Sequence, residues 1–176
     1  MAGDMRGCTL GLRAQRGGPV FVALAGPALL AAGVIACDDD DGPYGQARQM
    51  PETAARAFVA AVAASQQAWA QAGLAELIDR FGLPARVALI ANRATWVTDL
   101  LAHARGWADH VPVVEALAVR AATRAAILAL GLPLAEPDET TLAGRLAAEA
   151  DWLRGLGQGQ RPWTRKEKLA ALAAAG

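Results

Sequence analysis

The 176-residue sequence has few of the side chains that most often carry out chemistry. It contains two cysteines, two histidines and a single serine, Ser65. Two cysteines provide no disulfide framework, and neither Cys-x-x-Cys nor His-Glu-x-x-His occurs as a zinc-binding spacing. Ser65 lies outside any Gly-x-Ser-x-Gly motif, and no glycine-rich phosphate loop or dinucleotide fingerprint is present. The sequence therefore predicts no catalytic residue, no metal and no cofactor, and indicates a protein that is not an enzyme.

An excess of charge of one sign is also absent. Seventeen lysines and arginines balance seventeen aspartates and glutamates, so the formal net charge at neutral pH is zero. Proteins that depend on long-range attraction to nucleic acids usually carry a clear positive excess. The balance predicts that nucleic acid is not a partner.

Long apolar runs are rare, and the one that occurs lies near the start, over residues 19–36. Arginines precede it, and four aspartates, Asp38 to Asp41, follow it after Cys37. A basic start followed by an apolar segment is typical of a signal peptide. The run also reaches the lower length limit of a membrane-spanning helix, about 17 residues. Because Pro27 interrupts the run, a cleaved signal is favoured, with an uncleaved membrane anchor as the alternative.

The residues Val34-Ile35-Ala36-Cys37 resemble the lipobox of bacterial lipoproteins. The resemblance covers only about the first 37 residues, and it implies cleavage before Cys37 and lipidation of this cysteine. Several acyl chains together give a stable membrane anchor, whereas one chain is marginal. In enterobacterial lipoproteins, an aspartate directly after the lipidated cysteine favours retention at the inner membrane. Asp38 has this position, so the resemblance implies a periplasm-facing protein anchored in the cell envelope, with the inner membrane favoured.

Beyond residue 50 the chain is rich in alanine, leucine and arginine, a composition that favours helix. The apolar spacing predicts helices over 52–81, 85–107, 109–130 and from 138 onward. Phe81-Gly82-Leu83-Pro84 and Leu130-Gly131-Leu132-Pro133 are expected helix ends, because glycine and proline stop a helix there. Thr164 and Glu167 have the spacing of a capping box and predict a last helix reaching about residue 175.

These patterns predict an all-α fold, an antiparallel helical bundle of about four helices with a short C-terminal helix. The expected division of the chain is a signal peptide over 1–36, an acidic flexible tether over 37–50, the bundle over 51–157, and a basic linker with a short helix over 158–176.

Two groups of residues are candidates for binding. His103 and His110 are the only histidines, and Asp99 precedes His103 by four residues, a spacing at which a carboxylate can orient an imidazole. The C-terminal end is locally basic and carries two tryptophans, as expected of a surface that contacts a membrane or a partner. Its candidate residues are Trp152, Arg161, Trp163, Arg165, Lys166 and Lys168. Arg120 and Arg124 share a helix face, and a salt-bridged surface is the favoured interpretation of them, ahead of an anion site.

Together these features predict a membrane-anchored helical lipoprotein that acts without catalysis, binding a protein partner as an accessory module of an envelope complex. Two alternatives stay open. One is a carrier of a hydrophobic ligand or cofactor within the bundle. The other is a single-pass membrane-anchored protein of the exclusion or immunity type.

Overall fold

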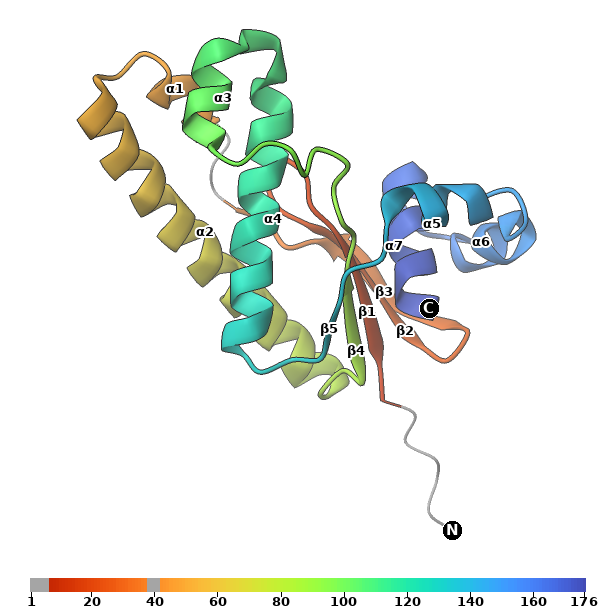
Figure 1. Cartoon of the computed structure of the whole chain (residues 1–176). Helices are drawn as coiled ribbons and strands as arrows, with labels where there is room; N and C mark the ends of the chain where they lie inside the picture. Colours follow the sequence, from red (N-terminus) through yellow and green to blue (C-terminus); the bar gives the residue numbers. More distant parts are fainter. Residues whose placement is uncertain (1–6, 38–41) are drawn as a thin grey trace.

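The computed structural model describes residues 7–37 and 42–176 and shows a five-stranded mixed sheet with helices on both faces (Figure 1). The strand order is β3-β2-β1-β4-β5. The strands are β1 (Thr9–Arg13), β2 (Val20–Ala25), β3 (Ala28–Val34), β4 (Arg86–Leu89) and β5 (Leu134–Ala135). β1 pairs antiparallel with β2 and β2 with β3, whereas β4 lies parallel to both β1 and β5.

The apolar run at residues 19–36 forms the β2–β3 hairpin of this sheet. Gly26 and Pro27 make its turn, and Gly26 has a φ of 57°, in the left-handed region that glycine adopts readily. β2 is an interior strand whose side chains are almost all buried, which explains its uninterrupted apolar sequence. Cys37, just after β3, is buried as well.

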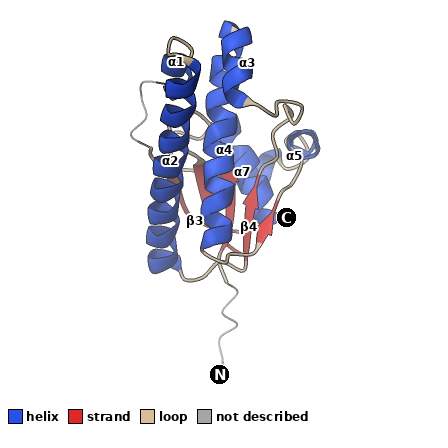
Figure 2. Ribbon diagram, turned by 60° about the vertical axis from the view of Figure 1, so that its left-hand side comes forward, coloured by secondary structure: helices blue, strands red, loops and turns tan. Residues whose placement is uncertain are grey.

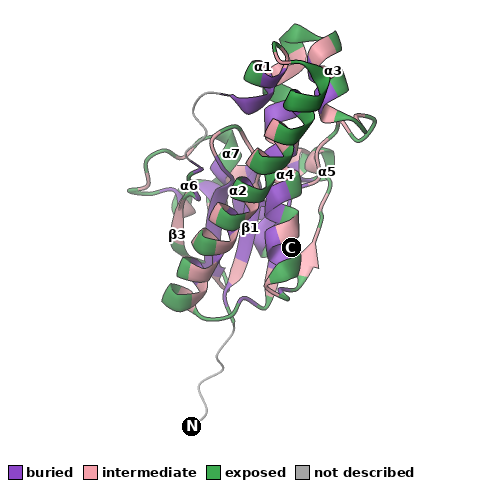
Figure 3. Ribbon diagram, turned by 90° about the vertical axis from the view of Figure 1, so that its left-hand side faces the viewer, coloured by how far each residue is buried: buried purple, intermediate pink, exposed green. Residues whose placement is uncertain are grey.

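One face of the sheet is covered by α2 (Glu52–Phe81) and α4 (Val111–Ala129), which lie side by side (Figure 2). The outward side of α2 is mostly exposed (Figure 3). The other face is covered by α7 (Arg165–Ala175), with α5 (Glu139–Arg145) and α6 (Ala150–Leu156) beyond it (Figure 1). The short elements α1 (Pro43–Ala47), α3 (Leu100–Gly106) and η1 (Ala108–His110) extend the α2–α4 side past the sheet.

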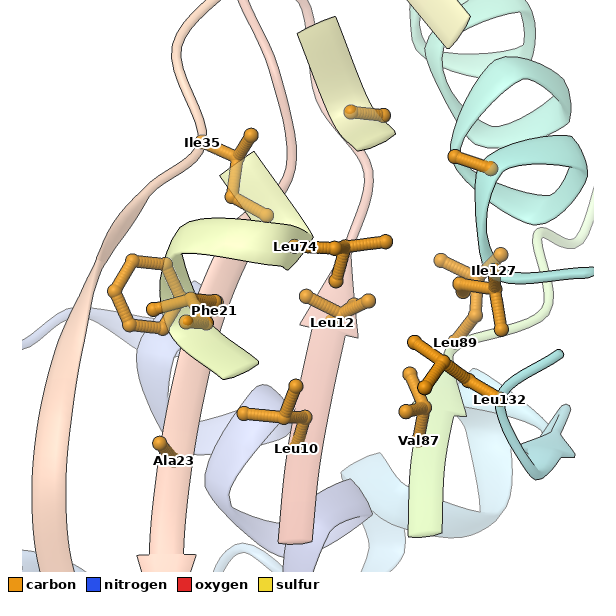
Figure 4. Packing of buried hydrophobic residues seen from close by; sticks show 13 residues of the cluster. Leu10, Leu12, Phe21, Ala23, Ile35, Leu74, Val87, Leu89, Ile127 and Leu132 are labelled. Carbon is orange, nitrogen blue, oxygen red and sulfur yellow. The ribbon is translucent and has the colours of Figure 1, made fainter. Parts of the chain in front are cut away.

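Each face of the sheet has its own apolar core. On the α2–α4 side, Leu10, Leu12 and Leu89 meet Leu74 and Ile127 (Figure 4). On the opposite face, the strand residues that alternate with those of the first core, such as Val22 and Ala88, pack against α7. The buried residues of α7 are mostly alanines. Small side chains on α7 let the helix approach the sheet closely. The tightest approach is at Gly11 of β1, where an added Cβ would lie 1.8 Å from the carbonyl oxygen of Ala170.

The predicted all-α fold is wrong, and so is the antiparallel helical bundle. Residues 20–34, taken as part of a signal segment, form two strands, and residues 86–89, taken as helix, form β4. A short apolar run has the same composition whether it becomes a buried strand, a buried helix or a signal segment, so periodicity did not separate these possibilities. The predicted helices at 52–81 and 109–130 correspond closely to α2 and α4, and Gly82 and Gly131 follow helix ends as expected.

The predicted signal peptide stays a prediction, as does lipidation of Cys37. The structure adds that cleavage before Cys37 would remove β1, β2 and β3, three of the five strands. Asp38, the predicted sorting residue, lies outside the described residues. Within the described ranges, no helix is both long enough and apolar enough to span a membrane.

Candidate functional site

The carboxyl ends of the parallel strands β1 and β4 meet at one edge of the sheet, which is where α/β proteins commonly bind ligands. A cleft of about 390 Å³ opens there, and we call it the edge cleft. Its walls come from the segments that follow β1 and β4, from the first turns of α4 and from the start of α5. The lining residues are Arg13, Ala14, Gln15, Arg16, Ile90, Asn92, Pro112, Val113, Ala116, Arg120 and Glu139.

Ion pairs hold the arginines of the edge cleft in place. Arg13, the last residue of β1, pairs with Glu139 at 3.3 Å between Nη2 and Oε2, and both side chains are largely buried. Arg120 of α4 donates from Nε to the carbonyl oxygen of Ile90 at 2.9 Å and from Nη2 to Glu136 at 2.6 Å. These bonds fix the guanidinium groups of Arg13 and Arg120 at the sheet edge.

Glu136 joins two arginines of α4. Its Oε1 accepts from Arg120 and, at 3.1 Å, from Nε of Arg124. Burial raises the pKa of Glu136, but the hydrogen bonds and charges of Arg124 and Arg120 outweigh burial, so the pKa is lowered overall. The salt bridges expected of Arg120 and Arg124 are therefore present, although the Arg120 side chain is only 18% exposed and does not lie on an open surface.

The first turn of α7 lies beside the edge cleft. Nζ of Lys166 donates a hydrogen bond to Oε1 of Gln15, one of the cleft residues. Thr164 and Glu167 form the predicted capping box, in which the backbone N–H of Thr164 donates to Glu167 at 2.6 Å. Burial raises the pKa of Glu167, and the hydrogen bonds from Thr164 more than compensate, so the pKa is lowered overall.

Replacing Glu167 with glutamine is expected to lower the free energy of unfolding by about 1 kcal/mol at neutral pH, the usual contribution of a helix cap. Because the folded-state pKa of Glu167 is lowered, its charge stabilises the fold above the unfolded pKa. This stabilisation is lost as the pH falls through the folded pKa. Urea unfolding of wild type and Glu167→Gln at a series of pH values measures the effect. A difference that stays constant down to acidic pH would contradict it.

A second hollow, the α6–α7 groove, lies between α6 and the start of α7 and has a volume of about 690 Å³. Four cations line it, and no carboxylate does. Its lining residues are Leu146, Ala150, Leu153, Arg154, Gly157, Gln158, Gly159, Arg161, Trp163, Arg165 and Lys168. Four of the six C-terminal candidates therefore come together here. The other two, Lys166 and Trp152, lie at the edge cleft and at a separate pocket beside Arg145 and Glu149.

The two histidines also come together. Nε2 of His103 lies 3.0 Å from Nδ1 of His110, although the helix is interrupted between them. The exposed rings of Trp96 and Trp107 pack against them, at 64% and 62% exposure. Asp99 instead caps α3 by accepting from the N–H of Ala102 and pairs with Arg56. The hydrogen bond from Arg56 is the main cause of the lowered pKa of Asp99.

Comparison with known proteins shows what fold this is. No family model and no curated protein matches the sequence. Among solved structures, Thermus thermophilus RuvC in complex with a Holliday junction substrate matches with a TM-score of 0.54 at 19% identity, covering 96% of this chain and 90% of that chain. Another structure of Thermus thermophilus RuvC matches with a TM-score of 0.53 at 17% identity, covering 96% and 91%. At this identity the likeness establishes the shared fold.

This likeness overturns several predictions from the sequence. The prediction of a helical, non-enzymatic accessory module of an envelope complex is wrong, because the matching protein is described with a substrate. The prediction that the chain is not an enzyme is wrong for the same reason. The exclusion of nucleic acid as a partner is also wrong, since that substrate is a DNA junction. A zero net charge did not exclude nucleic acid because it says nothing about how charges are distributed over the surface.

Almost none of the edge cleft is predicted from the sequence. Arg13 was counted only as part of a basic N-terminal segment, and Glu139 and Asn92 were not considered. One signal for the cleft was present in the sequence. Arg13 comes directly after the apolar run that ends at Leu12, and Asn92 comes two residues after the run that ends at Ile90. This signal becomes meaningful only when β1 and β4 are recognised as adjacent parallel strands.

Proposed function

We propose that this chain is a nucleic-acid-binding protein that takes branched DNA as its ligand. The observation that carries the proposal is the match along 96% of the chain to RuvC in complex with a Holliday junction. The alignment runs over nearly the whole of both chains, so the likeness is to the fold as a whole and not to one segment of it.

The position of the cations supports this proposal. Arg13, Arg16 and Arg120 line the edge cleft, and Lys166 reaches the same place from α7. Arg13 and Arg120 are held there by ion pairs with Glu139 and Glu136, which leave further guanidinium N–H groups for a phosphate. Guanidinium groups bind phosphate oxygens with paired, directional hydrogen bonds, and contacts to phosphates provide most of the affinity of proteins for DNA. The edge cleft is therefore the place where the DNA backbone is expected to meet the sheet.

Enzymes that cut nucleic acids often hold a pair of divalent metal ions between carboxylates. Glu139 and Glu136 at this edge are each bound to arginine, and Glu167 is bound to Thr164. Among residues 7–37 and 42–176, no group of three histidine, cysteine, aspartate or glutamate side chains is placed to hold a metal ion. The described residues do not fit such a pair of ions, and we assign no metal-dependent step to them.

The proposal is tested by fluorescence anisotropy with a labelled four-way DNA junction and a linear duplex of the same arm sequence. We expect the protein to bind the junction more tightly, with an affinity that falls steeply as salt increases. Lys166→Gln is expected to weaken binding about threefold and to lower the salt slope by about one. The matched control is Arg80→Gln, which also removes an exposed positive charge, but at the far end of α2.

Strand cleavage in the same samples is followed on denaturing gels with and without magnesium, because the matching protein is described with its substrate. Absence of binding to either DNA at low salt would contradict the proposed function. Equal binding to junction and duplex would contradict the preference for branched DNA.

A further inference from the structure

The α6–α7 groove lies on the face of the sheet opposite α2 and α4, next to the start of α7. At about 690 Å³ it is larger than the edge cleft, which measures about 390 Å³. A hollow of this size is in the usual range for small-molecule sites and has room for more than a single small ion. The groove thus has the dimensions of a nucleotide-sized binding site.

The charge of the groove is positive throughout. Of the four lining cations, Arg154 pairs at 2.9 Å with Asp151, an exposed carboxylate that does not itself line the groove. Arg161, Arg165 and Lys168 form no ion pair with any described residue. Three uncompensated cations around one concave surface repel one another, and an anion that binds there relieves this repulsion.

The wall of the groove is held rigidly by Trp163. Its Nε1 donates to the carbonyl oxygen of Leu153 at 2.9 Å, which ties the segment before α7 to α6. The indole lies directly on the backbone of Gly157, where an added Cβ would be 2.2 Å from Cδ1 of Trp163. Leu153 itself is buried in the core beneath. The segment that leads into α7 is therefore already packed against α6. A ligand of the groove does not have to order this segment when it binds.

We infer that the α6–α7 groove is a second DNA-contacting site, which binds phosphodiester groups of the backbone through Arg161, Arg165 and Lys168. This inference rests on the proposed function. The link between the two sites is α7, because its first turn offers Lys166 to the edge cleft and Arg165 and Lys168 to the groove. A DNA strand that leaves the edge cleft along the start of α7 meets the groove next.

The test compares three single variants, Arg165→Glu, Lys168→Glu and the control Arg80→Glu, each of which exchanges a positive for a negative charge. Acidic residues in the first turn of a helix are favourable, so Arg165→Glu is expected to fold normally. Binding of the labelled four-way junction is measured by anisotropy over a range of salt concentrations. We expect each groove variant to bind about tenfold more weakly, with a smaller salt slope, while Arg80→Glu stays close to wild type.

The outcomes separate the two proposals. If all variants bind the junction as wild type does, the groove is not a DNA site, and the proposed function stands. If wild type binds neither DNA at low salt, both proposals fall. Vesicles containing anionic lipid are titrated in parallel. If the protein binds these vesicles, its groove variants bind DNA as wild type does, and Lys168→Glu abolishes vesicle binding, the groove recognises lipid phosphate. The assignment of the groove to DNA is then overturned.

Discussion

Replacing Gly11 with valine is expected to lower the free energy of unfolding by about 3 kcal/mol or more, because β1 cannot retain its contact with α7. A Cβ at this position would lie 1.8 Å from the carbonyl oxygen of Ala170 and 2.8 Å from the backbone nitrogen of Ala174. Both are backbone atoms, which cannot turn away as a side chain can. Either α7 moves off the sheet and opens the core beneath it, or β1 is displaced.

Urea unfolding followed by far-ultraviolet circular dichroism measures this effect, and Gly11→Ala is expected to show a large part of it. The control is Gly155→Ala in α6, where an added Cβ has nothing within 4 Å. This control is expected to be neutral or to stabilise the protein by up to about 1 kcal/mol, as glycine-to-alanine changes do in compatible helix positions. If Gly11→Ala has the same urea midpoint as wild type, the close approach of α7 to β1 is contradicted.

The second large effect is expected at Glu115, a buried carboxylate in α4. Its Oε1 accepts from the backbone N–H groups of Tyr44 at 2.8 Å and Gly45 at 3.3 Å, at the start of α1. Glu115→Ala removes this acceptor and leaves buried donors without it, at a cost of about 2 to 4 kcal/mol. The loss should appear in urea unfolding and as faster hydrogen exchange in α1.

Glu115→Gln keeps an amide oxygen of the same reach and is the matched comparison. We expect it to retain more stability than Glu115→Ala, because the neutral oxygen still accepts a hydrogen bond, although a weaker one. If the glutamine and alanine variants are equally unstable, the hydrogen bonds to α1 are not what Glu115 contributes. If both variants are as stable as wild type, the hydrogen bonds between Glu115 and the start of α1 are contradicted.

The helical half of the fold was predictable because its signals are local. The helix over 52–81 and the capping box of Thr164 and Glu167 follow from residue spacing and propensity, and the structure confirms both. These features depend on neighbours within one or two turns, so they hold whatever the helices pack against.

The strands were not predictable in this way. Val20 to Val34 read as one apolar segment, and only its pairing with β1 shows that it is a hairpin at the sheet's antiparallel side. Arg86 to Leu89 fits a helical stripe equally well, and it becomes a strand because β1 and β5 supply its hydrogen-bond partners. Strand preference depends on such partners more than on the residues themselves.

The basic, tryptophan-bearing C-terminal segment was recognisable from composition, and so was its role as a candidate contact surface. Its separation into Lys166 at the edge cleft and Arg165 and Lys168 in the α6–α7 groove depends on how α7 sits on the sheet. The edge cleft itself joins Arg13 to Glu139, residues 126 positions apart. Local sequence determined the helices, their caps and the charges they carry. The tertiary structure alone decided the sheet and both candidate sites, because strand pairing and charge clustering depend on contacts between residues far apart in the chain.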